Sequence, residues 1–247
     1  MTVRVGSATD LGQRRTQNED RLGVWIPDPA EQRERGVLLV VADGMGGALA
    51  GEVASQLAVD CVLREYRSGV PDVVESLRHA VEVANRVIHD HSASFPELRG
   101  MGTTCTAVVI RQGEAFFAHV GDSRAYRLRD GAMRQLTEDH SLVAQLVLHH
   151  HLTPEQARHD PRRNVVTRSV GVGAEVEIDA GRFDESLAPK DTLLLCTDGL
   201  HGLVDDAEIA HAASQSDLDQ ACRDLIALAN ERGGHDNITV VIARLDA

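Results

Sequence analysis

The sequence predicts an α+β fold in which pairs of helices are layered outside antiparallel sheets. Helical periodicity occurs in adjacent pairs, early and late in the chain, and runs of strand-like residues lie between the pairs. This order lacks the strand–helix alternation that is typical of a parallel, doubly wound sheet. The dipeptide Asp130-Gly131 between two strand-like stretches also indicates a tight antiparallel hairpin.

Each element follows from its local pattern, in chain order. Residues 21–26 and 37–42 are rich in aliphatic side chains and predict two strands. Apolar residues spaced three and four apart then predict helices over 51–67 and 73–91. The remaining predicted strands cover residues 103–111, 115–120, 125–129, 192–197 and 238–245, and the remaining predicted helices cover 206–213 and 216–232.

Residues 141–170 have a different character from the stretches around them. They contain short helical pieces, a Thr-Pro helix start and two prolines, which predict a surface flap of the kind that often gates a site. The chain has no internal repeat and no linker long enough to separate domains. We therefore expect a single domain over residues 1–247 that carries a flap at about residues 141–170.

The charge balance excludes several classes of partner. The chain of 247 residues has 25 Lys+Arg against 38 Asp+Glu, a formal net charge of −13. A nucleic-acid binder or a protein that docks on an anionic membrane normally has a basic surplus. The longest apolar run, residues 37–42, is far too short for a membrane span, and the start lacks the apolar core of a secretory signal. We expect a cytoplasmic protein without nucleic-acid or membrane contacts.

The four cysteines are expected to be structural. Cys61, Cys105, Cys196 and Cys222 are widely spaced, no Cys-x-x-Cys pair occurs, and three of them lie in apolar stretches. This spacing favours neither a zinc site nor a disulfide framework, so the thiols act as small buried apolar groups.

Five aspartates lie where strand-like runs begin or end: Asp20, Asp43, Asp122, Asp198 and Asp236. A single Asp-Gly is usually a turn. Five such positions are different, because strand ends meet at a common edge and carboxylates gathered there repel one another unless a cation is present. Oxygen ligands without histidine or cysteine suit Mg²⁺ or Mn²⁺. Since Gly44 has no side chain, its carbonyl can also approach a metal, and the pattern predicts a binuclear or higher metal site.

The same residues carry a resemblance to a known family. Seven short motifs occur in a fixed order: Arg15-x-x-Asn18-Glu19-Asp20, Val41-Ala42-Asp43-Gly44-Met45-Gly46-Gly47, Gly102-Thr103-Thr104, Gly121-Asp122-Ser123-Arg124, Asp139-His140-Ser141, Thr197-Asp198-Gly199-Leu200 and Asp236-Asn237-Ile238-Thr239. Together they resemble the metal-dependent Ser/Thr protein phosphatases, protein phosphatase 2C in its compact bacterial form, over residues 2–245. The resemblance implies a four-layer α-β-β-α sandwich of two mostly antiparallel sheets flanked by helix pairs.

The resemblance also implies a role for each site residue. Two Mn²⁺ or Mg²⁺ ions would be held by four aspartates and one backbone carbonyl, those of Asp20, Asp43, Asp198, Asp236 and Gly44. Glu19 would orient a water molecule at the metals, and Arg15 would bind the substrate phosphate. Asp122, with Asp198, would serve a third and weaker ion. Such metals lower the pKa of a water molecule that attacks phosphorus, and a guanidinium anchors the phosphate through two hydrogen bonds.

The general acid stays open at this point. Eukaryotic relatives place a histidine where this chain has Met45, so that position supplies no proton. His140 fits a structural role better than a catalytic one, and the role of His201 is undefined. The run His149-His150-His151 cannot converge on one ion from a helix, which favours a solvated flap tip. The Arg162-Arg163 pair could meet a phosphorylated substrate, with a solvated charge pair as the default.

The function that the resemblance implies is hydrolysis of phosphoserine and phosphothreonine on proteins, opposing bacterial Ser/Thr kinases. The partners would be phosphorylated proteins, including a Ser/Thr kinase, and the protein would be a monomer. Two alternatives remain: a phosphatase that acts on an anti-sigma-factor antagonist, and a catalytically silent regulatory relative. The Arg-x-x-Asn-Glu-Asp opening disfavours the first alternative, and the complete aspartate set disfavours the second.

Overall fold

The computed structural model describes residues 2–70 and 72–246. Antiparallel pairing joins its strands into a five-stranded sheet of order β1-β11-β10-β7-β8 and a six-stranded sheet of order β2-β3-β5-β6-β9, in which β4 also pairs with β3. The strands are β1 Val3–Asp10, β2 Asp20–Trp25, β3 Val37–Met45, β4 Gly102–Thr103, β5 Cys105–Arg111, β6 Glu114–Val120, β7 Arg124–Arg129, β8 Ala132–Gln135, β9 Asp179–Arg182, β10 Thr192–Cys196 and β11 Ile238–Leu245. The helices are α1 Pro29–Arg35, α2 Ala48–Ser68, α3 Val73–Ser94, the short 3-10 helix η1 Pro96–Leu98, α4 Leu142–Leu148, α5 Pro154–His159, α6 Asp198–His201, α7 Asp206–Ala213 and α8 Leu218–Glu231.

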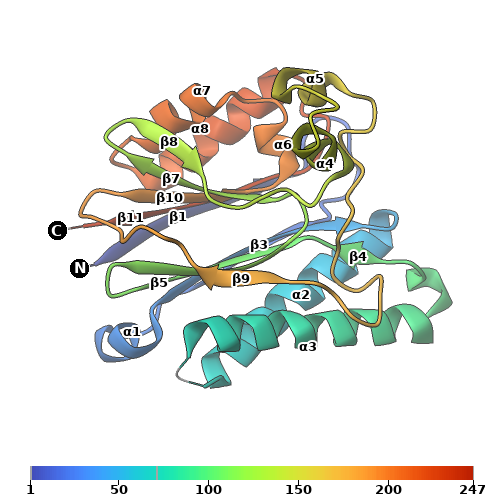
Figure 1. Cartoon of the computed structure of the whole chain (residues 1–247), viewed down its shortest axis with the longest axis horizontal. Helices are drawn as coiled ribbons and strands as arrows, with labels where there is room; N and C mark the ends of the chain where they lie inside the picture. Colours follow the sequence, from blue (N-terminus) through green and yellow to red (C-terminus); the bar gives the residue numbers. More distant parts are fainter. Residues whose placement is uncertain (1, 71, 247) are drawn as a thin grey trace.

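The two sheets stack face to face between two layers of helices (Figure 1). Helices α2 and α3 cover the outer face of the six-stranded sheet, and α7 and α8 cover the outer face of the five-stranded sheet. A third apolar cluster fills the space between the sheets. This confirms the predicted α+β class and the four-layer α-β-β-α sandwich.

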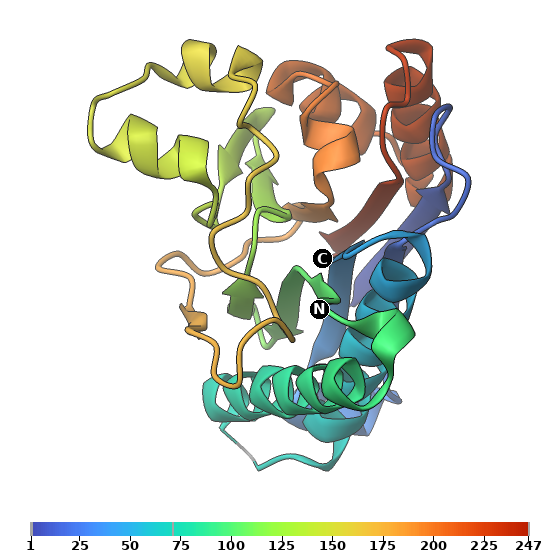
Figure 2. The same cartoon turned by 90° about the vertical axis from the view of Figure 1, so that its right-hand side faces the viewer.

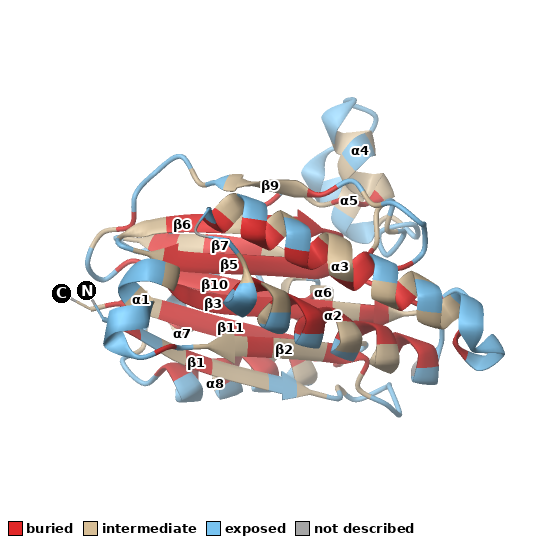
Figure 3. Ribbon diagram, turned by 90° about the horizontal axis from the view of Figure 1, so that it is seen from below, coloured by how far each residue is buried: buried red, intermediate tan, exposed pale blue. Residues whose placement is uncertain are grey.

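Strand β3 shows why the sequence contains one continuous apolar run. Val37, Leu39 and Val41 pack between the two sheets, whereas Leu38 and Val40 pack towards α2 and α3. Side chains of a strand alternate between its faces, so a strand that is buried on both faces must be apolar at every position. Figure 3 shows such central strands as buried along their length, between partly exposed helices.

The structure differs from the sequence prediction in the extent of β3 and in several missed elements. Strand β3 continues through Met45, so Asp43 and Gly44 lie inside a strand and not in a turn after it. Strand β1 was missed because its small residues, among them Gly6, leave room for α8. A Cβ at Gly6 would lie 2.5 Å from the backbone of Leu218. Helix α1, strand β9 and helix α6 were also missed, because each is short and α1 and β9 are mostly polar.

The predicted flap contains two short helices, α4 and α5, as expected. Its two stems are tied to each other and to the body by isolated bridges, Ser141 with Val166 and Thr103 with Val170. Figure 2 shows the flap standing beside the C-terminal helices and apart from α3. None of the helices in the described part of the chain combines the length and the apolar composition that crossing a bilayer requires. The four cysteines are buried and free, as predicted.

Candidate active site

Strands β2 and β3 place two carboxylates side by side. Asp20 and Asp43 are direct cross-strand partners in the antiparallel register. The Oδ2 atom of Asp20 accepts a 2.7 Å hydrogen bond from the Thr197 hydroxyl, which belongs to the other sheet's side of the sandwich. The backbone N–H of Asp43 donates to the Thr104 hydroxyl over 2.9 Å. Short polar side chains thus fix both aspartates where the two sheets meet.

The five-stranded sheet supplies two further aspartates to the same place. Asp198 opens helix α6 directly after Thr197, and Asp236 lies two residues before the start of β11. The segments are joined because the N–H of Thr197 donates to the carbonyl of Thr239 over 3.1 Å. The structure therefore brings together Asp20, Asp43, Asp198 and Asp236 from four segments, close enough for the charges of the other three to raise the pKa of Asp43.

Asn237 organises the loop that carries Arg15. Its side-chain Oδ1 accepts from the N–H of Glu19 over 2.8 Å, and its Nδ2 donates to the carbonyls of Leu11 and Gln17. Arg15 then reaches the aspartates and donates from Nη2 to Oδ2 of Asp236 over 2.7 Å. The candidate phosphate-binding residue, Arg15, and a candidate metal ligand, Asp236, are thereby held in contact.

Gly44 is required by the close approach of helix α2. A Cβ at this position would lie 2.1 Å from the carbonyl oxygen of Gly51, a contact that no side chain can make. Its N–H donates to the carbonyl of Glu19 over 3.1 Å. Glu19 is itself buried, with 7% of its surface exposed, and its carboxylate lies against the same helix at Gly51.

Burial and the charges of neighbouring carboxylates raise the pKa values of Asp20, Asp43, Asp122 and Asp198. Burial is the larger cause in each case, and the neighbouring carboxylates add to it. The pKa is raised to about 7 for Asp20, to about 6 for Asp198 and well above the usual range for Asp43. Burial also raises the pKa of Glu19, and the positive charge of Arg15 offsets only part of this rise.

These residues fit a divalent cation. Oδ1 of Asp20 and Oδ1 of Asp198 are buried without a hydrogen-bond partner, and a buried unpaired carboxylate oxygen is costly unless something positive binds it. The donor set is oxygen only, which suits Mg²⁺ or Mn²⁺. Among the described residues, no three His, Cys, Asp or Glu side chains surround one point closely enough to hold an ion as they stand. Mg²⁺ keeps several waters and takes one or two carboxylates, so a site of this kind does not need three.

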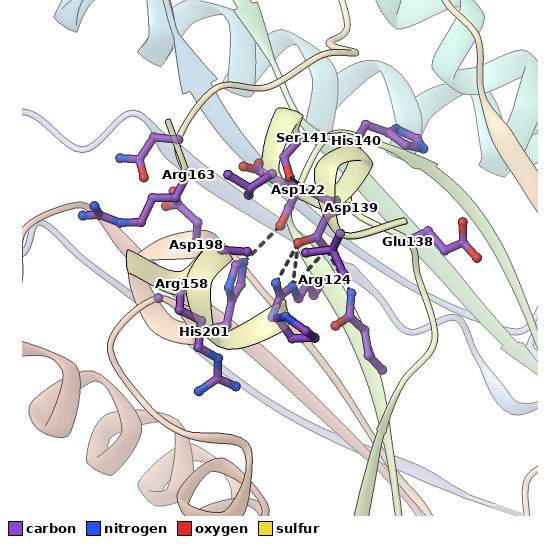
Figure 4. Close-up of a pocket in the computed structure, with 18 of the residues that line it drawn as sticks. Asp122, Arg124, Glu138, Asp139, His140, Ser141, Arg158, Arg163, Asp198 and His201 are labelled. Atoms are coloured by element: carbon purple, nitrogen blue, oxygen red, sulfur yellow. Dashed lines mark hydrogen bonds and ion pairs between the residues drawn. The ribbon is translucent and has the colours of Figure 1, made fainter. Parts of the chain in front are cut away.

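Asp122 lies beside this cluster in a setting of its own (Figure 4). Its side chain is buried, and burial, followed by the charge of Asp198, raises its pKa to about 8. His201 donates from Nε2 to the backbone carbonyl of Asp122 over 3.0 Å. Arg124 binds Asp139 next to it through hydrogen bonds of 2.7 and 2.9 Å. Burial and then Arg124 lower the pKa of His201 to about 3, so this imidazole is neutral near pH 7.

Two cavities that share lining residues meet at the cluster. A cavity of about 480 Å³ is lined by Arg15, Glu19, Asp43, Gly44 and Met45, among others. A second cavity of about 1850 Å³ lies between the flap and the body of the protein. Four of the residues that line both cavities are Arg15, Asp122, Asp198 and Asp236. The cluster is therefore reachable from a large surface cleft.

The other residues that the sequence analysis named lie outside the aspartate cluster. His140 accepts the N–H of Gly121 at Nδ1, so its other nitrogen carries the proton and donates to Asp179 over 3.2 Å. The residues of the histidine run are exposed or at the flap tip. Arg162 is paired with Asp160 over 2.9 Å.

Sequence reasoning missed the position of one flap residue and one buried ion pair. Arg163 lines the large cavity, and its positive charge acts on Asp198, a placement that only the fold of the flap creates. The Arg124–Asp139 pair had a signal in two of the seven motifs, but the motifs alone did not show that these residues meet.

Comparison with known proteins identifies the family. The family described as protein phosphatase 2C matches residues 12–240 of the chain. The serine/threonine phosphatase stp of Listeria innocua is 38% identical over 240 residues, which cover 95% of this chain and 92% of that protein. The crystal structure of the Mycobacterium tuberculosis serine/threonine phosphatase PstP/Ppp has a TM-score of 0.88 at 37% identity and covers 100% of both chains. The catalytic domain of the phosphatase PstP in complex with 2 manganese ions has a TM-score of 0.86 at 36% identity, with 99% of each chain covered. This chain belongs to the protein phosphatase 2C family.

Proposed function

We propose that this protein is a metal-dependent phosphatase that hydrolyses phosphoserine and phosphothreonine on proteins. The observation that carries the proposal is the meeting of four aspartates from both sheets, the buried Asp20 among them, beside the guanidinium of Arg15. This arrangement occurs in a chain that aligns over nearly its full length with named Ser/Thr phosphatases. Because both sheets contribute to one site and share one apolar core, we treat the chain as a single catalytic domain.

The metal ligands in this proposal are Asp20, Asp43, Asp198 and Asp236, together with the carbonyl of Gly44. Asp122 and Asp198 would serve a third, weaker ion, and the ions would be Mn²⁺ or Mg²⁺. When bound, two such ions activate a water molecule as the nucleophile and offset the charge of the phosphate. The unpaired oxygens of Asp20 and Asp198 support this assignment, because a cation would satisfy both.

The protein's own side chains would position the substrate. Arg15 is long enough to leave Asp236 and place two N–H groups on the phosphate oxygens, which a planar guanidinium binds well. Glu19, held against α2, would accept a hydrogen bond from the attacking water and orient it.

Phosphorylated proteins are the substrates that this site would take, and a Ser/Thr kinase is the partner that we expect among them. The relatives named as Ser/Thr phosphatases support the substrate class. We further propose that the protein acts as a monomer in the cytoplasm.

The experiment is hydrolysis of a phosphothreonine peptide and of an aryl phosphate by protein that has been stripped with a chelator. Both activities should be absent in excess chelator and return when Mn²⁺ is added. Asp43→Asn is the matched inactive variant, and it should stay inactive with Mn²⁺. Full turnover in excess chelator would refute the metal-dependent mechanism. Mn²⁺ binding without turnover of either substrate would identify a catalytically silent relative instead.

A further inference from the structure

Helix α4 presents an apolar face to the large cavity. Val143, Ala144, Val147 and Leu148 line that cavity and form what we term the α4 face. The structure describes every residue of α4, and none of them is buried. Leu148 is the most exposed of the four, at 69%. Figure 3 shows α4 projecting from the body without a buried segment. Val143, Ala144 and Val147 are half-exposed, so together with Leu148 they form a contiguous apolar surface of the kind that binding sites use.

The same cavity contains a surplus of unpaired acidic groups. Glu138, Glu155 and Asp206 line it, and within the described part of the chain their carboxylates have no ion pair. Other acidic groups at the cavity are already neutralised, as Asp205 is by Arg158 over 2.9 Å. With a net charge of −13 for the chain, this cleft favours a positively charged partner.

The cavity is continuous with the phosphatase site and large enough for a peptide. It shares Arg15, Asp122 and Asp198 with the small cavity around the aspartate cluster. Its volume of about 1850 Å³ exceeds the roughly 300–1000 Å³ of typical small-molecule pockets. A polypeptide whose phosphorylated side chain reaches the cluster would therefore lie with its neighbouring residues between α4, α5 and α7.

We propose that this cleft is a recognition groove for phosphopeptides that carry an aliphatic and a basic side chain close to the phosphorylated residue. The aliphatic side chain lies on the α4 face and removes its apolar surface from water. The basic side chain pairs with the carboxylates of Glu138, Glu155 or Asp206. This inference rests on the proposed function, since it names the substrate class that the same site prefers.

The first test uses the unaltered protein with Mn²⁺ and a set of phosphothreonine peptides. One peptide carries Leu and Arg on opposite sides of the phosphothreonine, a second has the reverse order, and further peptides replace Leu by Ser or Arg by Glu. An aryl phosphate reports the chemistry without a peptide. We expect kcat/KM to fall about tenfold for each replacement, as the loss of one apolar or charged contact predicts. Added salt should reduce the preference for Arg and leave the preference for Leu.

The second test alters the α4 face and the acidic side of the cleft in separate variants. The double substitution Val143→Thr/Val147→Thr keeps side-chain shape and adds polarity, and Glu155→Gln/Asp206→Asn removes charge. The first should abolish the Leu-over-Ser preference, and the second should abolish the Arg-over-Glu preference. Control variants are Ile26→Thr and Glu34→Gln, whose side chains are exposed at the far end of the β2–β3 pair. Both controls should retain both preferences.

The proposed recognition groove would be wrong if kcat/KM were equal for all peptides. It would also be wrong if the preferences survived both double substitutions. Hydrolysis of the aryl phosphate separates this outcome from failure of the proposed function. If the aryl phosphate is hydrolysed with Mn²⁺ and the peptides are not distinguished, only the groove is wrong. If neither the aryl phosphate nor any peptide is hydrolysed, the phosphatase assignment itself is wrong.

Discussion

The guanidinium of Arg15 donates a 2.7 Å hydrogen bond to the carboxylate of Asp236. The residue proposed to bind phosphate and a proposed metal ligand are therefore paired with each other. The two side chains are 46% and 25% exposed, and a pair of that kind contributes only about 0–1 kcal/mol. A cation at Asp236 would weaken the pair and free Arg15 for the phosphate. Metal binding and phosphate binding should therefore support each other.

Arg15→Ala should raise KM for a phosphopeptide more than it lowers kcat. The guanidinium would bind phosphate about equally in the ground state and the transition state, so its loss mainly weakens binding. Hydrogen bonds to charged groups are worth about 1.5–3 kcal/mol, which corresponds to a rise in KM of roughly 10- to 160-fold. Arg15→Lys should recover part of the loss. Steady-state kinetics decide the matter, and a change confined to kcat would place Arg15 on charge that develops during the reaction.

The stability of the chelated protein should fall as pH rises from about 4, near the pKa of an aspartate in the unfolded chain, to about 8. The folded-state pKa is raised to about 6 for Asp198, to about 7 for Asp20 and to about 8 for Asp122. For carboxyls with a raised folded-state pKa, the stabilising contribution is complete below the unfolded pKa and is lost as pH rises through the folded pKa. Thermal melts in chelator across this range measure it, and Mn²⁺ should restore the lost stability. A Tm that is independent of pH in chelator would contradict the charge cluster.

Removing one carboxylate should abolish turnover without unfolding the protein. In Asp198→Ala, a metal ligand is lost, yet the repulsion with Asp236 and Asp43 is relieved. We expect no measurable phosphatase activity and, in chelator near pH 8, a Tm at least equal to that of the unaltered protein. Circular dichroism melts and a phosphopeptide assay on the same sample check both parts. A normal rate in Asp198→Ala would remove the basis of the assignment.

Asp122→Ala should separate the weaker ion from the two central ions. Asp122 lies at the cleft beside Arg124 and His201, and Asp20, Asp43 and Asp236 remain intact in this variant. We expect nearly unchanged affinity for two Mn²⁺ ions, while turnover falls at least roughly tenfold, or about 1.4 kcal/mol in the barrier. Calorimetric titration beside kinetics distinguishes the outcomes. Loss of the tight ions would make Asp122 a central ligand, and unchanged turnover would make the third ion dispensable.

The two neighbouring flap arginines should behave differently. Arg163 lines the cleft and its charge acts on Asp198, whereas Arg162 is already paired with Asp160. Arg163→Ala should therefore raise KM for a phosphopeptide about tenfold, as expected for one lost charged contact. Arg162→Ala is the matched control and should change KM less than twofold, since exposed pairs contribute little. Equal effects of the two substitutions would show that Arg163 acts only through the general charge of the flap.

The sequence predicted the parts of the fold that depend on apolar patterning. Strand β10 was found because its residues form one continuous, mostly apolar run, and helix α8 was found because its buried residues repeat with a helical period. Strand β1 and helix α1 were missed for physical reasons. Helix α8 packs against Gly6, where a larger side chain would signal a strand but would not fit. Helix α1 buries no residue within its described range and depends on the Asp28 cap, which accepts from two backbone N–H groups.

The candidate site was predictable as a set of residues but not as a geometry. The five aspartates follow from their positions at strand ends, and the register pairing of Asp20 with Asp43 places the first two together. The contact between Arg15 and Asp236 joins residues 221 positions apart, and it exists only because Asn237 ties down the loop before β2. The position of Arg163 depends on the course of the flap, which has no periodic signal.

The most direct test of a cation centre built from these aspartates is the number of Mn²⁺ ions that the chelator-treated protein takes up at equilibrium dialysis. We expect two tightly bound ions per chain for the unaltered protein, a loss of at least one in Asp43→Asn, and no loss in the surface control Glu34→Gln. No uptake by the unaltered protein, or the same uptake by Asp43→Asn, would contradict this expectation.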